Sequence, residues 1–476
     1  SRGNFVSWSD HRTFMEITYA KFFAFALEEL RKVDPEGMLL NSGTQVSGAH
    51  NGCDYSRLNY YTRHLNAYEG GNQLDFHRSF NPDIKLSSGA GYGVLGKDVF
   101  YDFYSNLFKG SNGGAYIFWQ YSTLDPDLTM SQSGKDMEEG FAEMRGRGIG
   151  KLVGLATSDN HGIAIHYSYP SIHAAWILDG TIEERVVSQT SSKTMRQFDA
   201  NRDGWVKILR DSGLQFDFIS YGDIEKGMLS ERGYRALVLP MSLALSDEEI
   251  GAIRGFVSNG GILIADALAG VMDDRSGFRG TRSIADVFGI ETAWVDASTI
   301  IALEGEPELR LRGAVAHSQQ AGRPILLQNK FGEGQAFLLN YFLNGYPEDK
   351  LEGRNQAALE RMKKILGASG LSPKVRLTSL SGESVSDCAT YLFTSGKTQL
   401  YGLGPGKDRE GSQAVRITLE GEKTVYDVRR MSHLGSGSSF ADEIEPAIPR
   451  LFALVDGKVT KLQLAAPSVA SSGEDV

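Results

Sequence analysis

The sequence predicts a multidomain α/β protein, and three observations lead to this fold class. Apolar strands and amphipathic helices alternate over the first part of the chain, a second α/β pattern begins near residue 162, and short alternating strands follow residue 370. A chain of 476 residues is also too long for one ordinary domain. We therefore expect domains at residues 1–156, 157–369 and 370–466, and a disordered tail at 467–476.

The first domain is expected to hold a parallel sheet covered by helices. Apolar residues at helical spacing predict a helix over 10–33, which Ser9 or Asp10 caps and Asp34-Pro35 ends. Further elements are expected in the order strand 37–43, helix near 55–63, strand 64–71, strand 84–89, helix 97–108 and strand 115–123. This order is the βα alternation of a parallel sheet.

The second domain is expected to be a doubly wound sheet of flavodoxin-like size. Its strands are predicted at 162–168, 215–223, 234–242, 260–266 and 334–342, with helices at 195–212, 246–258 and 352–366. After "GASGLSP" the pattern changes to the short strands "ATYLFTS", "TQLYGLG", "AVRITLE", "KTVYDVR", "RLFALVDG" and "VTKLQLA". This last pattern predicts a small β-sandwich.

Composition excludes several classes of function. The net charge of −10 argues against nucleic acid as a partner, because phosphate binding needs clustered cations. Cys53 and Cys388 are the only cysteines, so neither a disulfide framework nor a CxxC motif is expected. No apolar run approaches the roughly 20 residues of a membrane helix. The first residues, "SRGNFVSWSDHRTF", do not resemble a signal peptide. We expect that the chain was cut from a longer protein, and its start does not indicate a cellular compartment.

No cofactor or metal is expected. The segment "DANRDG" (199–204) imitates a calcium loop, but Arg210 stands where a bidentate glutamate is needed, so we expect it to continue or cap a helix. The nine histidines include no HExxH pair, and the glycine-rich stretches lack the spacing of a dinucleotide site. The turn "LPMSLALS" has no cysteine, which excludes glutamine amidotransfer by the second domain.

A sugar site is expected where the strands of the first domain end. In parallel βα folds, ligands contact the carboxyl ends of the strands. These ends carry polar and aromatic side chains: Asn41, Tyr68, Glu69, Ser87, Ser88, Trp119 and Tyr121. Glycoside hydrolysis usually needs two carboxylates, and Glu69 is the only one at a strand end. The alternatives are that Glu69 bonds loop backbone and that Trp119 fills a core.

The order of these segments resembles that of glycoside hydrolase family 42 β-galactosidases. "FMEITYAKFFAFALEELRKVDP" with "GMLLNSG", "NAYEGG" and "FKGSNGGAYIFWQYS" resemble the family's fifth, sixth and eighth barrel units. "IAIHYSYPSIHAAWIL" and the α/β segment after it resemble the family's trimerisation domain, and the last hundred residues resemble its C-terminal β-domain. The resemblance implies strands five to eight of a (β/α)8 TIM barrel, a flavodoxin-like domain and a β-sandwich.

Two features depart from the family pattern. The acid/base glutamate, in an Asn-Glu pair after strand four, would lie before Ser1, and no Asn-Glu dipeptide occurs in the chain. The nucleophile at the end of strand seven falls at Ser87 or Ser88. Three explanations stay open: Glu69 takes over as nucleophile or base, the protein is an inactive relative, or the strand alignment is off by one unit.

The sequence therefore predicts a glycoside hydrolase of β-galactosidase type whose carboxylate pair lies partly outside this chain. Glu69 is the predicted catalytic residue, and the predicted substrate contacts are Asn41, Tyr68, Ser88, Trp119 and Tyr121. The alternative function is an inactive carbohydrate-binding or oligomer-scaffold relative. The expected partners are a glycoside or oligosaccharide and further copies of the chain, as a trimer formed through residues 157–369. Residues 167–178, which include Trp176, are expected to form part of the subunit contact.

Overall fold

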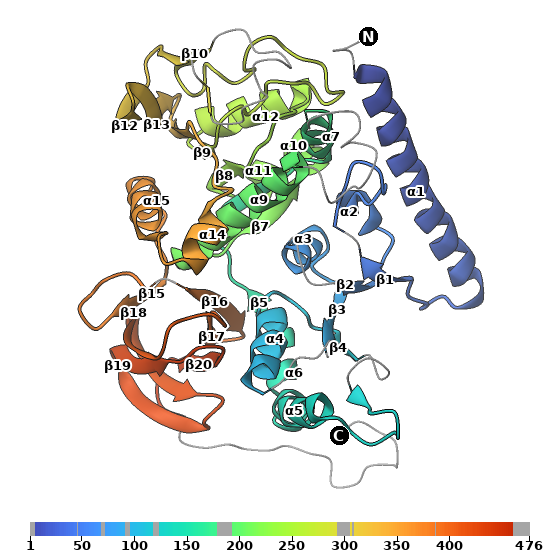
Figure 1. The fold of residues 1–476 in the computed structure, drawn as a ribbon, viewed down its shortest axis with the longest axis vertical. Helices are drawn as coiled ribbons and strands as arrows, with labels where there is room; N and C mark the ends of the chain where they lie inside the picture. The colour runs from blue at the N-terminus through green and yellow to red at the C-terminus, as the bar shows by residue number, and fades with distance from the viewer. Residues whose placement is uncertain are drawn as a thin grey trace.

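The computed structural model describes residues 5–44, 46–67, 72–90, 96–117, 123–178, 193–292, 305–306, 309–385 and 387–459. These residues form a mixed α/β fold with three large sheets and one two-stranded sheet (Figure 1). We call the parts of the chain that carry the three large sheets the first, second and third units, in chain order. The predicted domain limits themselves stay a prediction.

The first unit holds a parallel sheet with its strands in chain order. The strands are β1 (Leu40–Thr44), β2 (His64–Ala67), β3 (Lys85–Ala90) and β4 (Gly114–Ile117). The helices are α1 (Val6–Val33), α2 (Tyr55–Leu58), α3 (Gln73–Phe80), α4 (Lys97–Phe108), α5 (Gln132–Phe141) and α6 (Ile149–Gly154), with a π-helical turn at Ala142–Gly146. The predicted βα alternation is confirmed. Ser9 does not cap α1, because it lies inside the helix and its hydroxyl donates to Ser276 Oγ at 2.7 Å.

The second unit holds a seven-stranded sheet with the order β12-β13-β14-β9-β8-β6-β7. Its parallel strands are β6 (Ile163–Tyr167), β7 (Asp217–Ser220), β8 (Ala236–Leu239), β9 (Ile262–Ala265) and β14 (Gly334–Leu339). Numbered along the chain, these five have the order 2-1-3-4-5, which is that of flavodoxin-like sheets. Antiparallel β13 (Arg323–Phe331) and β12 (Val315–Gln320) extend the sheet beyond the prediction, and β10 (Ile290–Thr292) pairs with β11 (Leu309–Leu311).

Helices pack around this sheet, as the pattern predicts. They are α7 (Tyr169–Ile177), α9 (Lys193–Asp211), α10 (Tyr221–Glu225), α11 (Met228–Glu231), α12 (Asp247–Ser258), α14 (Tyr346–Leu351) and α15 (Gln356–Ala368). The calcium-loop imitation at 199–204 lies inside α9. Residues 169–175 and Ile177 are buried within this chain, and half-buried Trp176 stacks on Trp8 of α1 with ring centroids 4.6 Å apart. Most of 167–178 is therefore packed inside its own chain, and a contribution of half-buried Trp176 to a subunit contact stays a prediction.

The third unit is one antiparallel sheet. Its strands are β15 (Val375–Ser379), β16 (Cys388–Ser395), β17 (Thr398–Pro405), β18 (Gln413–Asp427), β19 (Ser432–Ile444) and β20 (Arg450–Val455), and β5 (Thr157–Ser158) joins its edge. The predicted strands at 414–420 and 423–429 merge into β18, whose pairing with β19 is irregular between Thr418 and Lys423. The predicted sandwich of two sheets is not confirmed, because the described strands form one hydrogen-bonded sheet.

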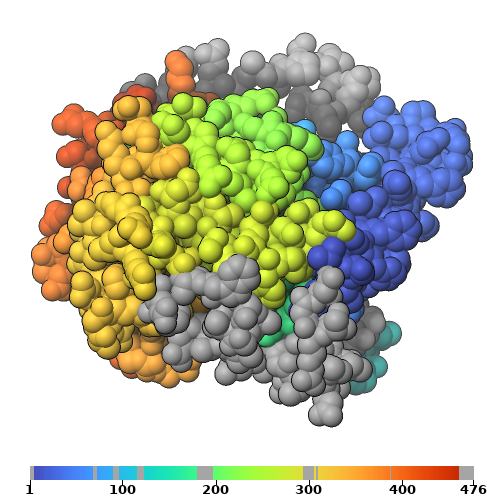
Figure 2. Space-filling view, turned by 90° about the horizontal axis from the view of Figure 1, so that it is seen from above, coloured from blue at the N-terminus to red at the C-terminus, as the bar shows by residue number. Residues whose placement is uncertain are grey.

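The first and second units share a hydrophobic core. Tyr55, Leu58 and Phe76 of the first unit belong to the same buried cluster as Tyr167 and Trp205 of the second. Figure 2 shows residues of the N-terminal segment, in blue, packed against green and yellow residues of the second unit. The position of the first sheet relative to the second is therefore fixed by apolar packing.

Candidate functional site

The predicted site lies at the carboxyl ends of β1 to β4. Asn41 and Ser88 are placed by the structure, whereas Tyr68, Glu69, Trp119 and Tyr121 lie outside the described residues. Thr44, Ala67, Ala90 and Ile117 end the four strands, so Glu69 follows the end of β2 by two positions in the sequence.

Strand register assigns Asn41 and Ser88 to the face of the sheet that helices cover. Asn41 pairs with Leu65, and Leu65 and Leu86 pack against Leu74 of α3. Partners in a parallel pair point to the same face, so Asn41 belongs to this helix-covered face. Ser88 pairs with Ala67, and its Oγ lies 3.1 Å from the Ser111 Oγ in a buried contact. The role of both residues in substrate binding stays a prediction.

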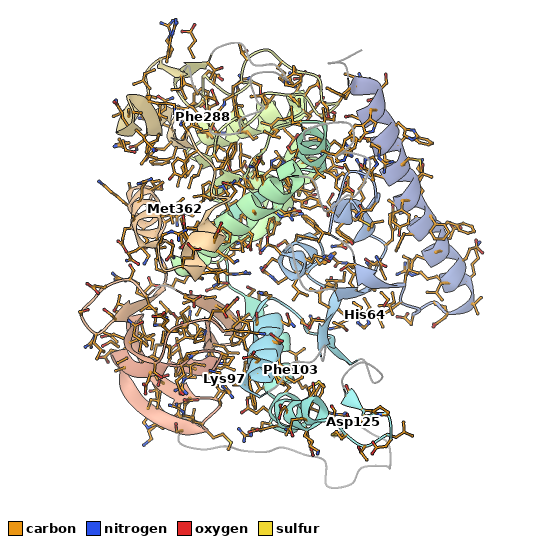
Figure 3. All side chains as sticks on the ribbon, viewed as in Figure 1. His64, Lys97, Phe103, Asp125, Phe288 and Met362 are labelled. Carbon is orange, nitrogen blue, oxygen red and sulfur yellow. The ribbon has the colours of Figure 1, made fainter. Side chains whose placement is uncertain are left out.

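The opposite face, which we call the inner face, carries a row of polar side chains. Ser42 pairs with Asn66, and Asn66 pairs with Ser87. His64 lies two positions before Asn66, and its Nε2 is 2.6 Å from the Ser87 Oγ (His64 is labelled in Figure 3). Asn66 is 4% exposed, and its Oδ1 has no hydrogen-bond partner among the described residues. The amide oxygen is therefore buried without a hydrogen bond from any described residue.

Close packing shapes this face at the start of β4. A Cβ at Gly113 would lie 3.0 Å from the Leu86 carbonyl oxygen and 3.1 Å from the Ser87 Oγ. Only glycine fits there without a shift, so the loop before β4 approaches Ser87 closely. Burial lowers the pKa of His64, so its ring is neutral at pH 7 and both accepts and donates hydrogen bonds.

The inner face offers hydrogen bonds but no charge of the kind glycoside hydrolysis needs. Its described side chains are Leu40, Ser42, His64, Asn66, Lys85 and Ser87, and none of them is a carboxylate. Ser87 and Ser88, where a nucleophile glutamate is expected, bond to His64 and Ser111 respectively. A carboxylate at this site must therefore come from residues beyond the strand ends.

The sequence analysis missed His64, Asn66 and Ser87 as site candidates. It chose the side chains nearest the strand ends, and Asn41 and Ser88 are on the helix-covered face. The two-residue period of "HLNA" would have placed His64 and Asn66 on one face and Leu65 on the other. The apolar side chains Leu65 and Ala67 indicate which of these faces the helices cover.

The second unit holds a buried acid at the carboxyl end of β9. Asp266 accepts hydrogen bonds from Asn201 Nδ2 at 2.6 Å, Trp205 Nε1 at 3.0 Å and the Met241 backbone N–H at 2.8 Å. Burial raises the pKa of Asp266 to about 7. Met241 has a φ of 45°, in the turn where an amidotransferase would carry its cysteine. Asp266 thus stabilises a strained turn that presents a methionine and no nucleophile.

The described residues contain no cluster of three His, Cys, Asp or Glu side chains able to hold a metal ion. Both thiols are free, and burial raises the pKa of Cys388 to about 12. None of the helices in the described ranges is long and apolar enough to cross a membrane.

Comparison with known proteins places the fold. Residues 174–299 match the β-galactosidase trimerisation domain. No curated protein matches the chain at the level of sequence. A family 42 β-galactosidase from G. stearothermophilus superposes with a TM-score of 0.68 at 16% identity, over 94% of this chain and 68% of that one. A β-galactosidase from Bacillus circulans sp. alkalophilus gives 0.67 at 13% identity, over 94% and 68%.

A family 42 exo-carrageenase from Bacteroides ovatus superposes with a TM-score of 0.56 at 13% identity, over 94% of this chain and 56% of that one. At such identities the comparisons establish the fold alone. The names of these proteins include both β-galactosidases and an exo-carrageenase, so proteins with this fold act on different substrates. The resemblance predicted from the sequence is therefore confirmed: over nearly its whole length the chain has the fold of glycoside hydrolase family 42 β-galactosidases, and residues 174–299 of its second unit match their trimerisation domain.

Proposed function

We propose that this chain is part of a glycoside hydrolase of β-galactosidase type that acts on β-linked galactosides or related glycosides. The observation that carries the proposal is the superposition on two β-galactosidases over 94% of the chain. The polar inner face, with Asn66 Oδ1 unpartnered among the described residues, supports a sugar ligand, because sugar hydroxyls donate and accept hydrogen bonds.

In this proposal β1 to β4 are strands five to eight of a TIM barrel, and the third unit corresponds to the family's C-terminal β-domain. Glu69 is the carboxylate that this chain contributes, because it follows β2 at the carboxyl edge of the sheet. Tyr68, Trp119 and Tyr121 stack on or bond to the sugar, and a second carboxylate lies outside the chain.

The chemistry divides between the two carboxylates. One donates a proton to the glycosidic oxygen as the bond breaks, and the other attacks the anomeric carbon or activates a water molecule. Glu69 takes the second role, as nucleophile or base. His64, Asn66 and Ser87 bind sugar hydroxyls from the inner face and hold the ring in place.

A second candidate function is a catalytically inactive relative that binds sugars or holds an oligomer together. The observation that favours it is the pair Ser87 and Ser88, whose hydroxyls are engaged by His64 and Ser111 where a nucleophile glutamate is expected. The assembly proposed with either function is a trimer formed through the second unit, because residues 174–299 match a trimerisation domain.

A panel of aryl glycosides, assayed with the full-length parent of this chain at micromolar concentration, tests the choice. If the protein is a hydrolase, we expect it to turn over at least one β-linked substrate. We also expect the free sugar to compete with that substrate for the site. Asn66→Leu, which keeps the side chain's size but removes the amide, should weaken both the turnover and the binding of that sugar. Sugar binding without turnover on any substrate would instead support the inactive relative.

A further inference from the structure

The loop that follows β1, residues 46–54, leaves the sheet at the edge where parallel βα folds hold their sites. Asn51 shapes this loop from within. Its Nδ2 donates to the Val46 carbonyl at 2.7 Å, and its Oδ1 accepts from the backbone N–H groups of Gly48 at 3.2 Å and Cys53 at 3.0 Å. Residues 47–49 are also buried, although they belong to a loop.

Two tyrosines of the second unit bond to the middle of this loop. The Tyr167 hydroxyl, at the end of β6, lies 2.7 Å from the Ser47 Oγ. The Tyr169 hydroxyl, at the start of α7, donates to the Gly48 carbonyl at 2.7 Å and contacts Asn51 Oδ1 at 3.3 Å. Both tyrosines are 1% exposed or less. Burial raises the pKa of each, so both hydroxyls keep their protons and remain donors.

A third tyrosine holds the end of the loop. The Tyr221 hydroxyl, at the start of α10, donates to Asp54 Oδ2 at 2.7 Å. Asp54 caps α2 by accepting from the Ser56 N–H at 3.1 Å, and Arg57 Nε contacts both Asp54 and Tyr221. The last residue of the loop is therefore tied to the second unit by a charge-assisted hydrogen bond.

These contacts lie at the carboxyl edge of the second sheet, which is the edge that binds ligands in related folds. In flavodoxin-like sheets the ligand binds outside the carboxyl ends of the strands. Tyr167, Tyr169 and Tyr221 lie at the carboxyl ends of β6 and β7, and they bond to the loop of the first unit. Residues 46–54 thus contact the second sheet at the carboxyl ends of β6 and β7.

We propose that Tyr167, Tyr169 and Tyr221 are positioning residues, which fix residues 46–54 at the rim of the β1–β4 sheet so that the second unit sets the geometry of the sugar site. The proposal rests on the proposed function, because it assigns that site to the same edge of the sheet. If the loop loses these hydrogen bonds, only a fraction of the molecules holds it in the conformation that binds substrate. The apparent affinity for substrate then falls in proportion to that fraction. The expected signature is a raised KM with kcat retained.

Hydrogen–deuterium exchange tests the structural half of the proposal. Tyr169→Phe removes one hydroxyl and leaves the buried Gly48 carbonyl with only the longer hydrogen bond from the Asn51 N–H, at 3.3 Å. Tyr104→Phe is the matched control, because it removes an equally buried hydroxyl that donates to Glu143 at 2.8 Å, away from the loop. We expect the amides of 47–53 to exchange about tenfold faster in Tyr169→Phe, the scale of one lost buried hydrogen bond, and at the wild-type rate in the control.

Kinetics of the full-length parent of this chain test the functional half. The double variant Tyr167→Phe/Tyr169→Phe should raise KM for an aryl glycoside several-fold, with kcat and oligomer mass unchanged. Equal loop exchange in Tyr169→Phe and Tyr104→Phe would overturn the proposal, and so would faster exchange with an unchanged KM in the double variant. Absence of turnover by the wild-type protein would refute the proposed function instead, and the exchange comparison would still decide whether the tyrosines hold the loop.

Discussion

The contact between Glu16 of α1 and His173 of α7 gives a sharp test of how the first and second units are joined. His173 Nε2 lies 2.7 Å from Glu16 Oε1, and the two side chains are 1% and 2% exposed. The His173 ring also packs edge-on against Trp8 and Tyr169, with centroids 5.5 and 5.3 Å apart. Replacing Glu16 therefore leaves an imidazole nitrogen buried without its partner.

Glu16→Ala should lower the free energy of unfolding by about 2 kcal/mol. The lost hydrogen bond and the unpaired buried nitrogen together contribute about 1–3 kcal/mol. Glu16→Gln keeps the volume and an acceptor oxygen, so it should cost only about 1 kcal/mol. A double-mutant cycle compares the wild-type protein with Glu16→Ala, His173→Ala and the double variant. It isolates the interaction energy between the two side chains, because the ring packing lost in His173→Ala cancels.

Urea unfolding followed by tryptophan fluorescence measures these energies. Trp8 and Trp176 stack beside the pair, so their emission reports on this junction. We expect a coupling energy above about 1 kcal/mol from the four proteins. A coupling below about 0.5 kcal/mol would refute the reasoning that the pair joins the two units.

Two further predictions concern pH and assembly. Burial, with a smaller contribution from Lys374, lowers the pKa of His161 to about 4, and the ring accepts the Gln215 N–H at Nδ1. Because the unfolded chain binds this proton near pH 6.5, stability should fall by up to roughly 3 kcal/mol as the pH drops from 6.5 to 4, and His161→Gln should reduce that loss in denaturant titrations. For assembly, light scattering at micromolar concentration should give the mass of a trimer; a monomer would remove the oligomer from the proposal, and a dimer would keep an interface but exclude three subunits.

The sequence predicts the two α/β sheets because their strands are continuous apolar runs between helices. β6, β8 and β9 are buried along their whole length, so nothing competes with the strand prediction there. β19 escapes prediction because "SHLGSGSSFADEI" is rich in glycine and serine, which favour turns. It forms a strand because the edge of β18 offers it a ladder of hydrogen bonds.

The candidate site is predicted less well, for a physical reason. The sequence pattern suggests that Asn41 and Ser88 lie near strand ends, whereas Asn41 is the second residue of β1 and Ser88 lies inside β3. Only the register with Leu65 and Ala67 shows which face each belongs to. The Tyr169–Gly48 bond joins residues 121 positions apart. Such contacts depend on how two units pack, and no local pattern in the sequence predicts them.

The measurement that tests the proposed function most directly is the turnover of an aryl β-galactoside by the full-length parent of this chain and by its Glu69→Gln variant. The substitution keeps the shape and hydrogen bonding of the side chain and removes its charge. The exposed Asp83 provides a control, as Asp83→Asn, because it removes a carboxylate at the opposite end of β3. We predict that Glu69→Gln lowers kcat by several orders of magnitude and that the control leaves it unchanged. A Glu69→Gln variant that keeps more than about a tenth of the wild-type rate would contradict the assignment of Glu69 as the catalytic carboxylate.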